Sequence, residues 1–364
     1  MENTTLVEKQ DQIIQETPKE NKRLVGLDLL KILSMFFILI HHFSKHGGFY
    51  ENATGFTQTF LLILNDLFLP SVNVFVFISA YLIVKKNKFS LKKLLYLFLE
   101  IIFFALLTYF FFLIISKEQF NIKTFFACLN PIENYFWFTN AYVFMYLLSP
   151  VLLMIINKLN KNGYLILLLT LFIITLFSTY TPFFPILNNG FTWMWFVFLF
   201  FFAGYQAKFE INLKKWIWLI IYIIAISLSF FVFGGEVVKL PIYTSAIAIL
   251  ETISLFNLFK DINIKNNKFA KIIMVIQSCT LGIYLLHDSI FTRNILYSKI
   301  FCTQNFYLKP TSLLWFILFV FITFIVCLLF DLGKKYICKL FLKLFDKIKN
   351  KRKQKTSCNQ KDTD

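Results

Sequence analysis

Residues 24–43 read LVGLDLLKILSMFFILIHHF, a largely apolar block that contains four ionisable side chains. An α-helix rises 1.5 Å per residue, so about 20 such residues cross a hydrocarbon core roughly 30 Å thick. Nine further apolar blocks follow, at 60–84, 94–116, 137–157, 164–181, 192–207, 216–233, 241–259, 272–291 and 311–331. The sequence therefore predicts an all-α, polytopic membrane helix bundle of about ten transmembrane helices, the first at 25–44.

The composition excludes a soluble globular domain. Of the 364 residues, 58% are hydrophobic and 20% are aromatic, whereas only 16% are charged. Soluble domains carry about 25% charged residues. A soluble chain of this length has no interior large enough to bury ten apolar blocks.

The net charge of +17 raises the question of a nucleic-acid partner. A nucleic-acid binder clusters Lys and Arg on one face or along a groove, but here they lie between the apolar blocks, so we expect none. With the amino terminus inside, 29 of the 37 basic residues fall in cytosolic segments and seven fall outside. The positive-inside rule favours this arrangement, which places both termini in the cytosol.

Three regions follow from this pattern: a cytosolic polar tail at 1–24, a membrane domain at 25–331 and a basic cytosolic tail at 332–364. No internal repeat is visible, so nothing indicates an inverted-repeat transporter. The six cysteines form no C-x-x-C pair and have no metal-type spacing with the four histidines. We therefore expect no metal site.

The first block holds the strongest candidates for chemistry, because ionisable residues inside a membrane are costly. Asp28 and Lys31 are three residues apart and can pair on one helix face. Lys31 and His42 are eleven apart, about three turns and about 16 Å, so they share one stripe, whereas His41 points about 100° away. A histidine can act as a general base at neutral pH. Alternatively, Asp28 and Lys31 anchor the helix by snorkelling, and the histidines only mark its outer boundary.

The second block ends in VNVFVFISAYLI, where Ser79 and Tyr81 flank Ala80. Small residues at this point favour close helix packing, and the hydroxyls also suit a binding site. The loop that follows, KKNKFSLKK at 85–93, carries five lysines. They act either as orientation signals or as a surface for an anionic nucleotide.

Two later blocks carry polar residues. Asn140 and Tyr142, within WFTNAYVFMYLLSP, lie near the expected outer face and could line a cavity. The segment TLGIYLLHDSIF places Tyr284, His287 and Asp288 in an outward half. The His-Asp dipeptide is either a buried hydrogen-bonded pair or a second polar contribution to a site.

Taken in order, these motifs resemble the acyltransferase-3 family of integral membrane acyltransferases, over residues from about 23 to 331. Several members O-acetylate cell-surface polysaccharides, lipopolysaccharide or peptidoglycan. The family's Arg-x10-His signature matches Lys31 and His42, its Ser-Gly-Tyr/Phe element matches Ser79 to Tyr81, and its arginine-rich inner loop matches Lys92 and Lys93. Lysine at position 31 keeps the charge but loses the bidentate geometry of arginine.

The resemblance implies that acetyl-CoA, used as an acyl donor and not as a permanently bound cofactor, binds from the cytosol. Its acetyl group would pass to a hydroxyl of a cell-surface or lipid-linked polysaccharide, such as a capsule or exopolysaccharide, at the bacterial cytoplasmic membrane. His42 would be the base or acyl carrier, with Lys31 and Asp28 organising the route to it. The implied donor-binding or substrate-binding residues are Ser79, Tyr81, Lys92, Lys93, Asn140, Tyr142, Tyr284 and His287.

Two alternatives from other classes remain open. A glycan transporter or flippase would also have many spans and a few buried charges, although it would more often show repeats or broken helices. A glycan polymerase is expected to carry a large outer loop with several arginines, and the outer segments contain one.

Overall fold

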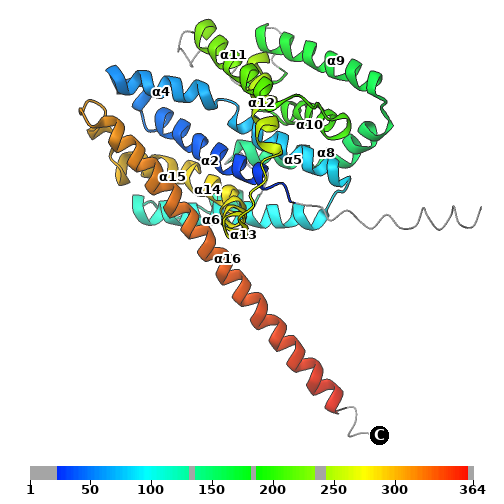
Figure 1. Cartoon of the computed structure of the whole chain (residues 1–364). Coiled ribbons are helices and arrows are strands. Elements are labelled where there is room, and N and C mark those ends of the chain that lie inside the picture. Colours follow the sequence, from blue (N-terminus) through cyan, green and yellow to red (C-terminus); the bar gives the residue numbers. More distant parts are fainter. Residues whose placement is uncertain (1–22, 131–135, 182–185, 234–242, 360–364) are drawn as a thin grey trace, which may run out of the picture.

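The computed structural model describes residues 23–130, 136–181, 186–233 and 243–359, and their side chains except those at 68, 230–233 and 342–359. Within these ranges every regular element is helical, and no strand occurs. The helices are α2 (Val25–Lys45), α3 (Phe49–Asn52), α4 (Gly55–Phe68), α5 (Ser71–Lys86), α6 (Leu91–Ser116), α7 (Ile122–Cys128), α8 (Trp137–Lys158), α9 (Lys161–Tyr180), α10 (Trp193–Phe209), α11 (Lys215–Phe233), α12 (Ala246–Lys260), α13 (Asn267–Ser278), α14 (Thr280–His287), α15 (Ile290–Asn294) and α16 (Ser312–Asn359). Two short 3-10 helices, η1 (Asn188–Gly190) and η3 (Thr303–Asn305), and one π-helix, η2 (Ile295–Ile300), complete the list, and Figure 1 shows the bundle.

Seven helical stretches in the described part of the chain are long and apolar enough to cross a membrane. They are Val25–Lys45, Gly55–Lys86, Leu91–Ser116, Trp137–Lys158, Lys161–Tyr180, Asn267–His287 and Ser312–Phe341. The other three expected blocks coincide with α10, α11 and α12, which are not among the seven. The all-α membrane bundle is confirmed, whereas the count of ten and the cytosolic termini stay predictions.

Two blocks that the sequence predicted as single helices are broken. The block at 60–84 changes from α4 to α5 at Pro70, because proline has no backbone N–H to continue the helical ladder. The block at 272–291 is divided between α13 and α14 at Cys279, and α14 ends at His287. The second break matters for the site, because it begins α14, the helix that ends at His287.

Helix α2 lies at the centre of the bundle, in contact with α4, α5, α12, α13, α14 and α16. Its buried face repeats every three or four residues through Leu27, Leu30, Ser34 and Ile38, as expected for a helix in a packed core. Gly26 allows close approach of α12, because a Cβ there would overlap the carbonyl oxygen of Phe259. The site residues of α2 therefore lie on a helix that other helices contact on several sides.

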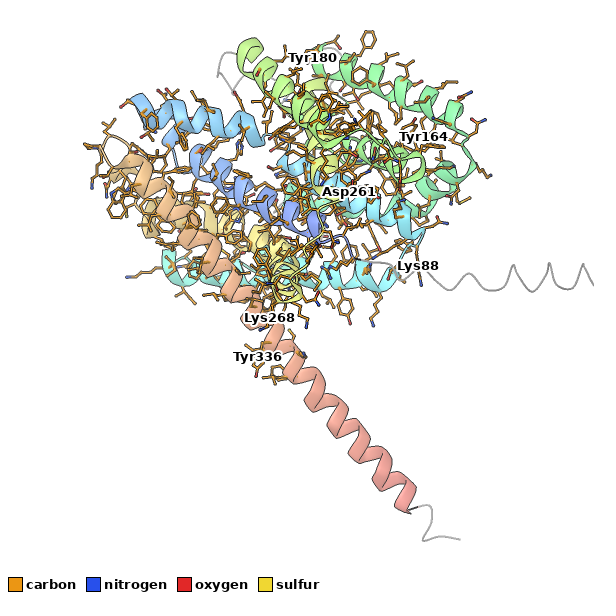
Figure 2. All side chains as sticks on the ribbon, viewed as in Figure 1. Lys88, Tyr164, Tyr180, Asp261, Lys268 and Tyr336 are labelled. Carbon is orange, nitrogen blue, oxygen red and sulfur yellow. The ribbon has the colours of Figure 1, made fainter. Side chains whose placement is uncertain are left out.

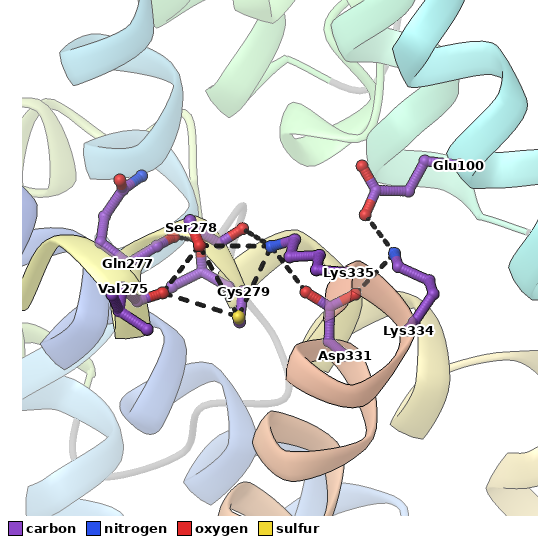
Figure 3. Close-up of polar contacts among 9 residues, drawn as sticks. Glu100, Val275, Gln277, Ser278, Cys279, Asp331, Lys334 and Lys335 are labelled. Carbon is purple, nitrogen blue, oxygen red and sulfur yellow. Dashed lines mark hydrogen bonds and ion pairs between the residues drawn. The ribbon is translucent and has the colours of Figure 1, made fainter. Parts of the chain in front are cut away.

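Helix α16 runs past the boundary expected at 331 and leaves the bundle as one continuous rod (Figure 1). Its exit point is fixed by the buried Asp331. Lys334 Nζ lies 2.6 Å from Asp331 Oδ1 and 2.7 Å from Glu100 Oε1 of α6. Lys335 Nζ lies 2.7 Å from Asp331 Oδ2 and donates to the Ser278 carbonyl oxygen at the α13 break (Figure 3).

The bundle has two opposite sides that can be compared with the expected orientation. Lys88 and Lys268, both expected inside, lie along the lower edge of the bundle in Figure 2, and Tyr180 lies at its upper edge. The orientation of the bundle in a membrane remains a prediction.

Candidate functional site

All four histidines of the chain meet around His42. The centroid of its ring lies 5.9 Å from that of His41, 5.4 Å from that of His46 and 5.1 Å from that of His287. His41 and His42 occupy the last turns of α2, His46 directly follows that helix, and His287 is the last residue of α14. The break at Cys279 and the end of α14 thus bring a second helix terminus to the end of α2.

Hydrogen bonds define the protonation of this cluster. The ring nitrogen Nδ1 of His287 lies 2.6 Å from the carbonyl oxygen of Ile283. Because a carbonyl only accepts, Nδ1 of His287 carries the proton, and its Nε2 is an acceptor in the neutral ring. His42 Nδ1 lies 2.9 Å from that Nε2, so it is the donor. The lone pair of His42 is therefore at its Nε2.

A carboxylate supports the same assignment. Asp288 Oδ1 lies 3.4 Å from His42 Nδ1, and an ionised carboxylate also only accepts. Arg293 holds this oxygen with two donors, Nη2 at 2.8 Å and Nε at 3.1 Å. The side chain of Asp288 is only 2% exposed, so the pair is shielded from water. Ser289, which caps α15 through its hydroxyl, sets the turn that brings Arg293 back toward Asp288.

One set of residues in the described part of the chain could hold a metal ion. Ligand atoms of His42, His46 and Asp288 lie within 4.8 Å of one another, a group that the cysteine and histidine spacing did not reveal. Burial and then the Arg293 charge lower the pKa of His46 to about 3, so its ring is neutral. The Arg293 guanidinium, however, already offsets the negative charge of the Asp288 carboxylate, which weakens its attraction for a cation. The contacts present therefore favour hydrogen bonding over metal ligation.

A cavity of about 640 Å³ runs beside α2. Near Lys31 it is lined by three further lysines, Lys86, Lys88 and Lys93, and near His42 it is lined by Lys45, His46, Asp288 and Arg293. Since Lys31 and His42 are about 16 Å apart along the helix, the cavity joins a basic end to the histidine cluster.

One wall of the cavity is a row of aromatic rings on α8. The ring of Tyr142 is stacked on Phe138 at 6.1 Å and on Tyr146 at 6.3 Å, with interplanar angles of 18° and 17°. The three positions are four residues apart, which places them on one helix face. The Tyr146 hydroxyl accepts from the backbone N–H of Ser90 at 3.2 Å, which ties this wall to the basic loop.

The structure brings most of the sequence-predicted residues to this cavity. Those that line it are Lys31, His42, Ser79, Lys93, Tyr142 and Tyr284. Ser79 and Tyr142 also share a side-chain hydrogen bond. His287 lies directly behind His42 as its hydrogen-bond partner.

Four other predicted residues lie elsewhere. Asp28 pairs with Arg23, with 2.6 Å between Oδ2 and Nε, instead of with Lys31, because Arg23 precedes the helix and reaches back to the first turn. Tyr81 packs on Phe256 with ring centroids 4.7 Å apart. The remaining two do not line the cavity: Lys92, whose ammonium lies over the ring of Tyr96, and Asn140.

Lys31 differs from Asp28, the other charged residue within the first block, which is paired with Arg23. Among the residues that the structure describes, no carboxylate lies within ion-pair distance of its ammonium, although Asp28 is only one turn away. A shielded ammonium that lines a cavity without a counter-ion is suited to an anionic ligand.

Sequence reasoning missed several residues of the site. Asp288 was noted only as a companion of His287, and Arg293, His46, Lys86 and Lys88 were not assigned to it. Arg293 carried one usable signal, since it is the one arginine in the segments expected outside. The others depend on the end of α14 and on the direction of the loop at 87–90, which no local pattern specifies.

A family model described as an acyltransferase domain matches residues 24–332. The chain belongs to the acyltransferase-3 family. This match supports a membrane acyltransferase, in agreement with the resemblance of its motifs. Searches of curated proteins and of solved structures found no match.

Proposed function

We propose that this acyltransferase is an O-acetyltransferase that moves an acetyl group from acetyl-CoA to a hydroxyl of a cell-surface or lipid-linked polysaccharide. The observation that carries the proposal is the tautomer of His42. Its Nδ1 is engaged by His287 and Asp288, so the lone pair that remains for a substrate hydroxyl is at Nε2, on a residue that lines the cavity.

The basic end of the cavity supports an anionic, nucleotide-containing donor. Lys31, Lys86, Lys88 and Lys93 all line it, and ammonium groups bind phosphates as point charges. The aromatic row on α8 gives the cavity an apolar wall along which the long arm of coenzyme A can run. This end faces the side that the charge distribution assigns to the cytosol, where acetyl-CoA is available.

The chemistry at the other end is a proton transfer coupled to acyl transfer. His42 Nε2 takes the proton of the acceptor hydroxyl as its oxygen attacks the thioester carbonyl. The tetrahedral intermediate then collapses, the C–S bond breaks, and the thiolate of coenzyme A takes the proton from His42. The products are an O-acetyl ester and free coenzyme A.

A two-step route would use the same nitrogen. There, His42 Nε2 itself attacks the thioester, and the acetyl-imidazole then transfers its acetyl group to the hydroxyl. Acid-quench mass spectrometry of the purified protein after mixing with acetyl-CoA alone distinguishes the routes, because only the second leaves an acetyl group on His42.

The acceptor and location belong to the proposal as well. The His42 end lies toward the expected outer face, where a polysaccharide or its lipid-linked precursor would arrive, and the protein would act in a bacterial cytoplasmic membrane. Capsule and exopolysaccharide are the acceptor classes that fit best. A glycan transporter, the runner-up from the sequence, would have no need of a base with an oriented lone pair.

The deciding experiment measures release of coenzyme A by the purified, detergent-solubilised protein with acetyl-CoA and a panel of bacterial polysaccharides. The wild type should consume the donor, and His42→Ala should lose about 10²–10⁴ of the rate, the usual contribution of a positioned base. His41→Ala is the matched control, because His41 also lines the cavity but uses Nδ1 to contact Asn65 Oδ1 at 2.5 Å. It should lose much less. A His42→Ala protein that acylates near the wild-type rate would overturn the proposal.

A further inference from the structure

We infer that Asp288 and Arg293 are positioning residues for His42: the carboxylate stabilises the charge that develops on the imidazole, and the guanidinium keeps the carboxylate from holding His42 in its protonated form. The inference rests on the proposed function. It adds two residues that follow α14 and act on His42 of α2. Arg293 lies outside the motifs that carry the family resemblance in this sequence, and those motifs assign no role to Asp288.

The geometry gives each residue one task. Asp288 Oδ1 lies 3.4 Å from His42 Nδ1, close enough for its charge to act on the ring. His287 Nε2 lies closer, at 2.9 Å, but it is neutral. When His42 takes a proton at Nε2, positive charge develops on the ring, and Asp288 is the nearby group whose charge stabilises it.

Arg293 is required because the carboxylate is buried. An unpaired buried carboxylate beside an imidazole favours the protonated ring, and a protonated ring has no lone pair for a hydroxyl. The two donors of Arg293, at 2.8 and 3.1 Å from the same Oδ1, offset that charge at rest. The Asp288–Arg293 pair thus leaves His42 neutral before the reaction, while the hydrogen bond to His287 keeps the proton on Nδ1.

A purely structural role is the competing explanation. Arg293 Nη2 also approaches the Asp288 carbonyl oxygen at 3.4 Å, and the pair shapes the turn between α14 and α15. Loss of a turn would lower the amount of folded protein and the rate at every pH. It would not move the pH dependence of the rate in opposite directions for the two residues.

The test is the pH profile of kcat/KM for acetyl-CoA. The titratable and charged groups around His42 are His41, Lys45 and His46 at the end of α2, His287 of α14, and Asp288 and Arg293. The acid limb of this profile is the part in which kcat/KM falls as the pH decreases and His42 becomes protonated. Asp288→Asn removes the charge that favours the protonated ring, so the acid limb should shift to lower pH, with a rate loss of about 10- to 10³-fold. Arg293→Gln leaves the carboxylate uncompensated, so the acid limb should shift to higher pH. Arg293→Lys keeps the charge and should restore most of the wild-type profile.

Asp331→Asn is the control, because Asp331 is also a buried, ion-paired carboxylate but does not line the cavity. It should keep the wild-type acid limb. If Asp288→Asn fails to accumulate, the two Arg293 variants, which retain Asp288, still decide the matter. Acid limbs at the wild-type position in Asp288→Asn or in Arg293→Gln would overturn the inference, and an inactive His42→Ala would then leave the proposed function intact. A wild type that consumes no acetyl-CoA with any acceptor would overturn the proposed function itself.

Discussion

His42 and His287 are 245 residues apart in the sequence, yet His42 Nδ1 lies 2.9 Å from His287 Nε2. This contact joins the end of α2 to the end of α14, two helices that pack against each other. His287 in turn donates from Nδ1 to the carbonyl oxygen of Ile283, one turn earlier in its own helix. The orientation of the His42 ring is thereby set by the backbone of another helix.

Replacing His287 should impair catalysis without removing the base. In His287→Ala the closer acceptor for His42 Nδ1 is lost, while Asp288 at 3.4 Å remains. We expect a loss of acetyl transfer of about tenfold to a hundredfold, less than the loss for His42→Ala. Steady-state kinetics on purified protein, normalised to the folded fraction from size-exclusion chromatography, provide the measurement. A loss equal to that of His42→Ala would instead make His287 the base.

Lys31 should tolerate arginine but not alanine. Its ammonium lines the cavity, and arginine, the residue that the family resemblance implies there, keeps the charge on a side chain of similar length. We expect Lys31→Arg to stay within about threefold of the wild type and Lys31→Ala to raise the KM for acetyl-CoA at least tenfold, as expected for a lost charge-assisted contact. An unchanged KM in Lys31→Ala would assign Lys31 to helix anchoring.

The basic loop offers a pair of neighbouring lysines with different predicted effects. Lys93 lines the cavity, whereas Lys92 lies over the ring of Tyr96. Lys93→Ala should therefore raise the KM for acetyl-CoA more than Lys92→Ala does, and Lys88→Ala should resemble Lys93→Ala. The difference should shrink as salt is added, because exposed charges are screened over about 8 Å at physiological ionic strength. Equal effects at positions 92 and 93 would mean that the two lysines act only through the general surface charge.

Chelation should not change the reaction. The group of His42, His46 and Asp288 has the spacing for a metal, but Arg293 occupies the Asp288 carboxylate. We expect full activity after dialysis against EDTA and inhibition by added Zn²⁺, which would take up the His42 lone pair. Loss of activity on dialysis that Zn²⁺ restores would show a metal centre instead.

The sequence predicts the all-helical character of this fold and most of its helices, for a physical reason. Apolar blocks and Lys distribution are local properties, and a bilayer imposes length and orientation on each block separately. The stripe from Lys31 to His42 follows likewise from helix geometry alone, and both residues line the cavity.

The rest of the site depends on breaks and ends that carry no periodic signal. Proline explains the division before α5, but the break at Cys279 lies in a continuous apolar block. That break begins α14, and the end of this helix places His287, Asp288 and Arg293. Asp28 is the opposite case, a contact that the sequence predicted and the structure does not contain. Its spacing allows a pair with Lys31, but its carboxylate pairs with Arg23 instead.

The number of membrane crossings gives the last prediction, because seven stretches satisfy the length and hydropathy of a span while ten apolar blocks occur. The difference concerns α10, α11 and α12, of which α10 has 17 residues and α12 has 15. Helices this short can cross if the bilayer thins locally or if flanking lysines snorkel, at a modest cost per ångström of mismatch. If all three cross, phosphatase and fluorescent reporters fused at Lys214, Glu236 and Lys265 should report cytosol, outside and cytosol in turn. Fusions at Lys88 (cytosol) and Lys299 (outside) serve as controls on either side of this region. A cytosolic signal at Glu236 would contradict crossing by α11 and α12 and reduce the count by two, with both termini still on the same side.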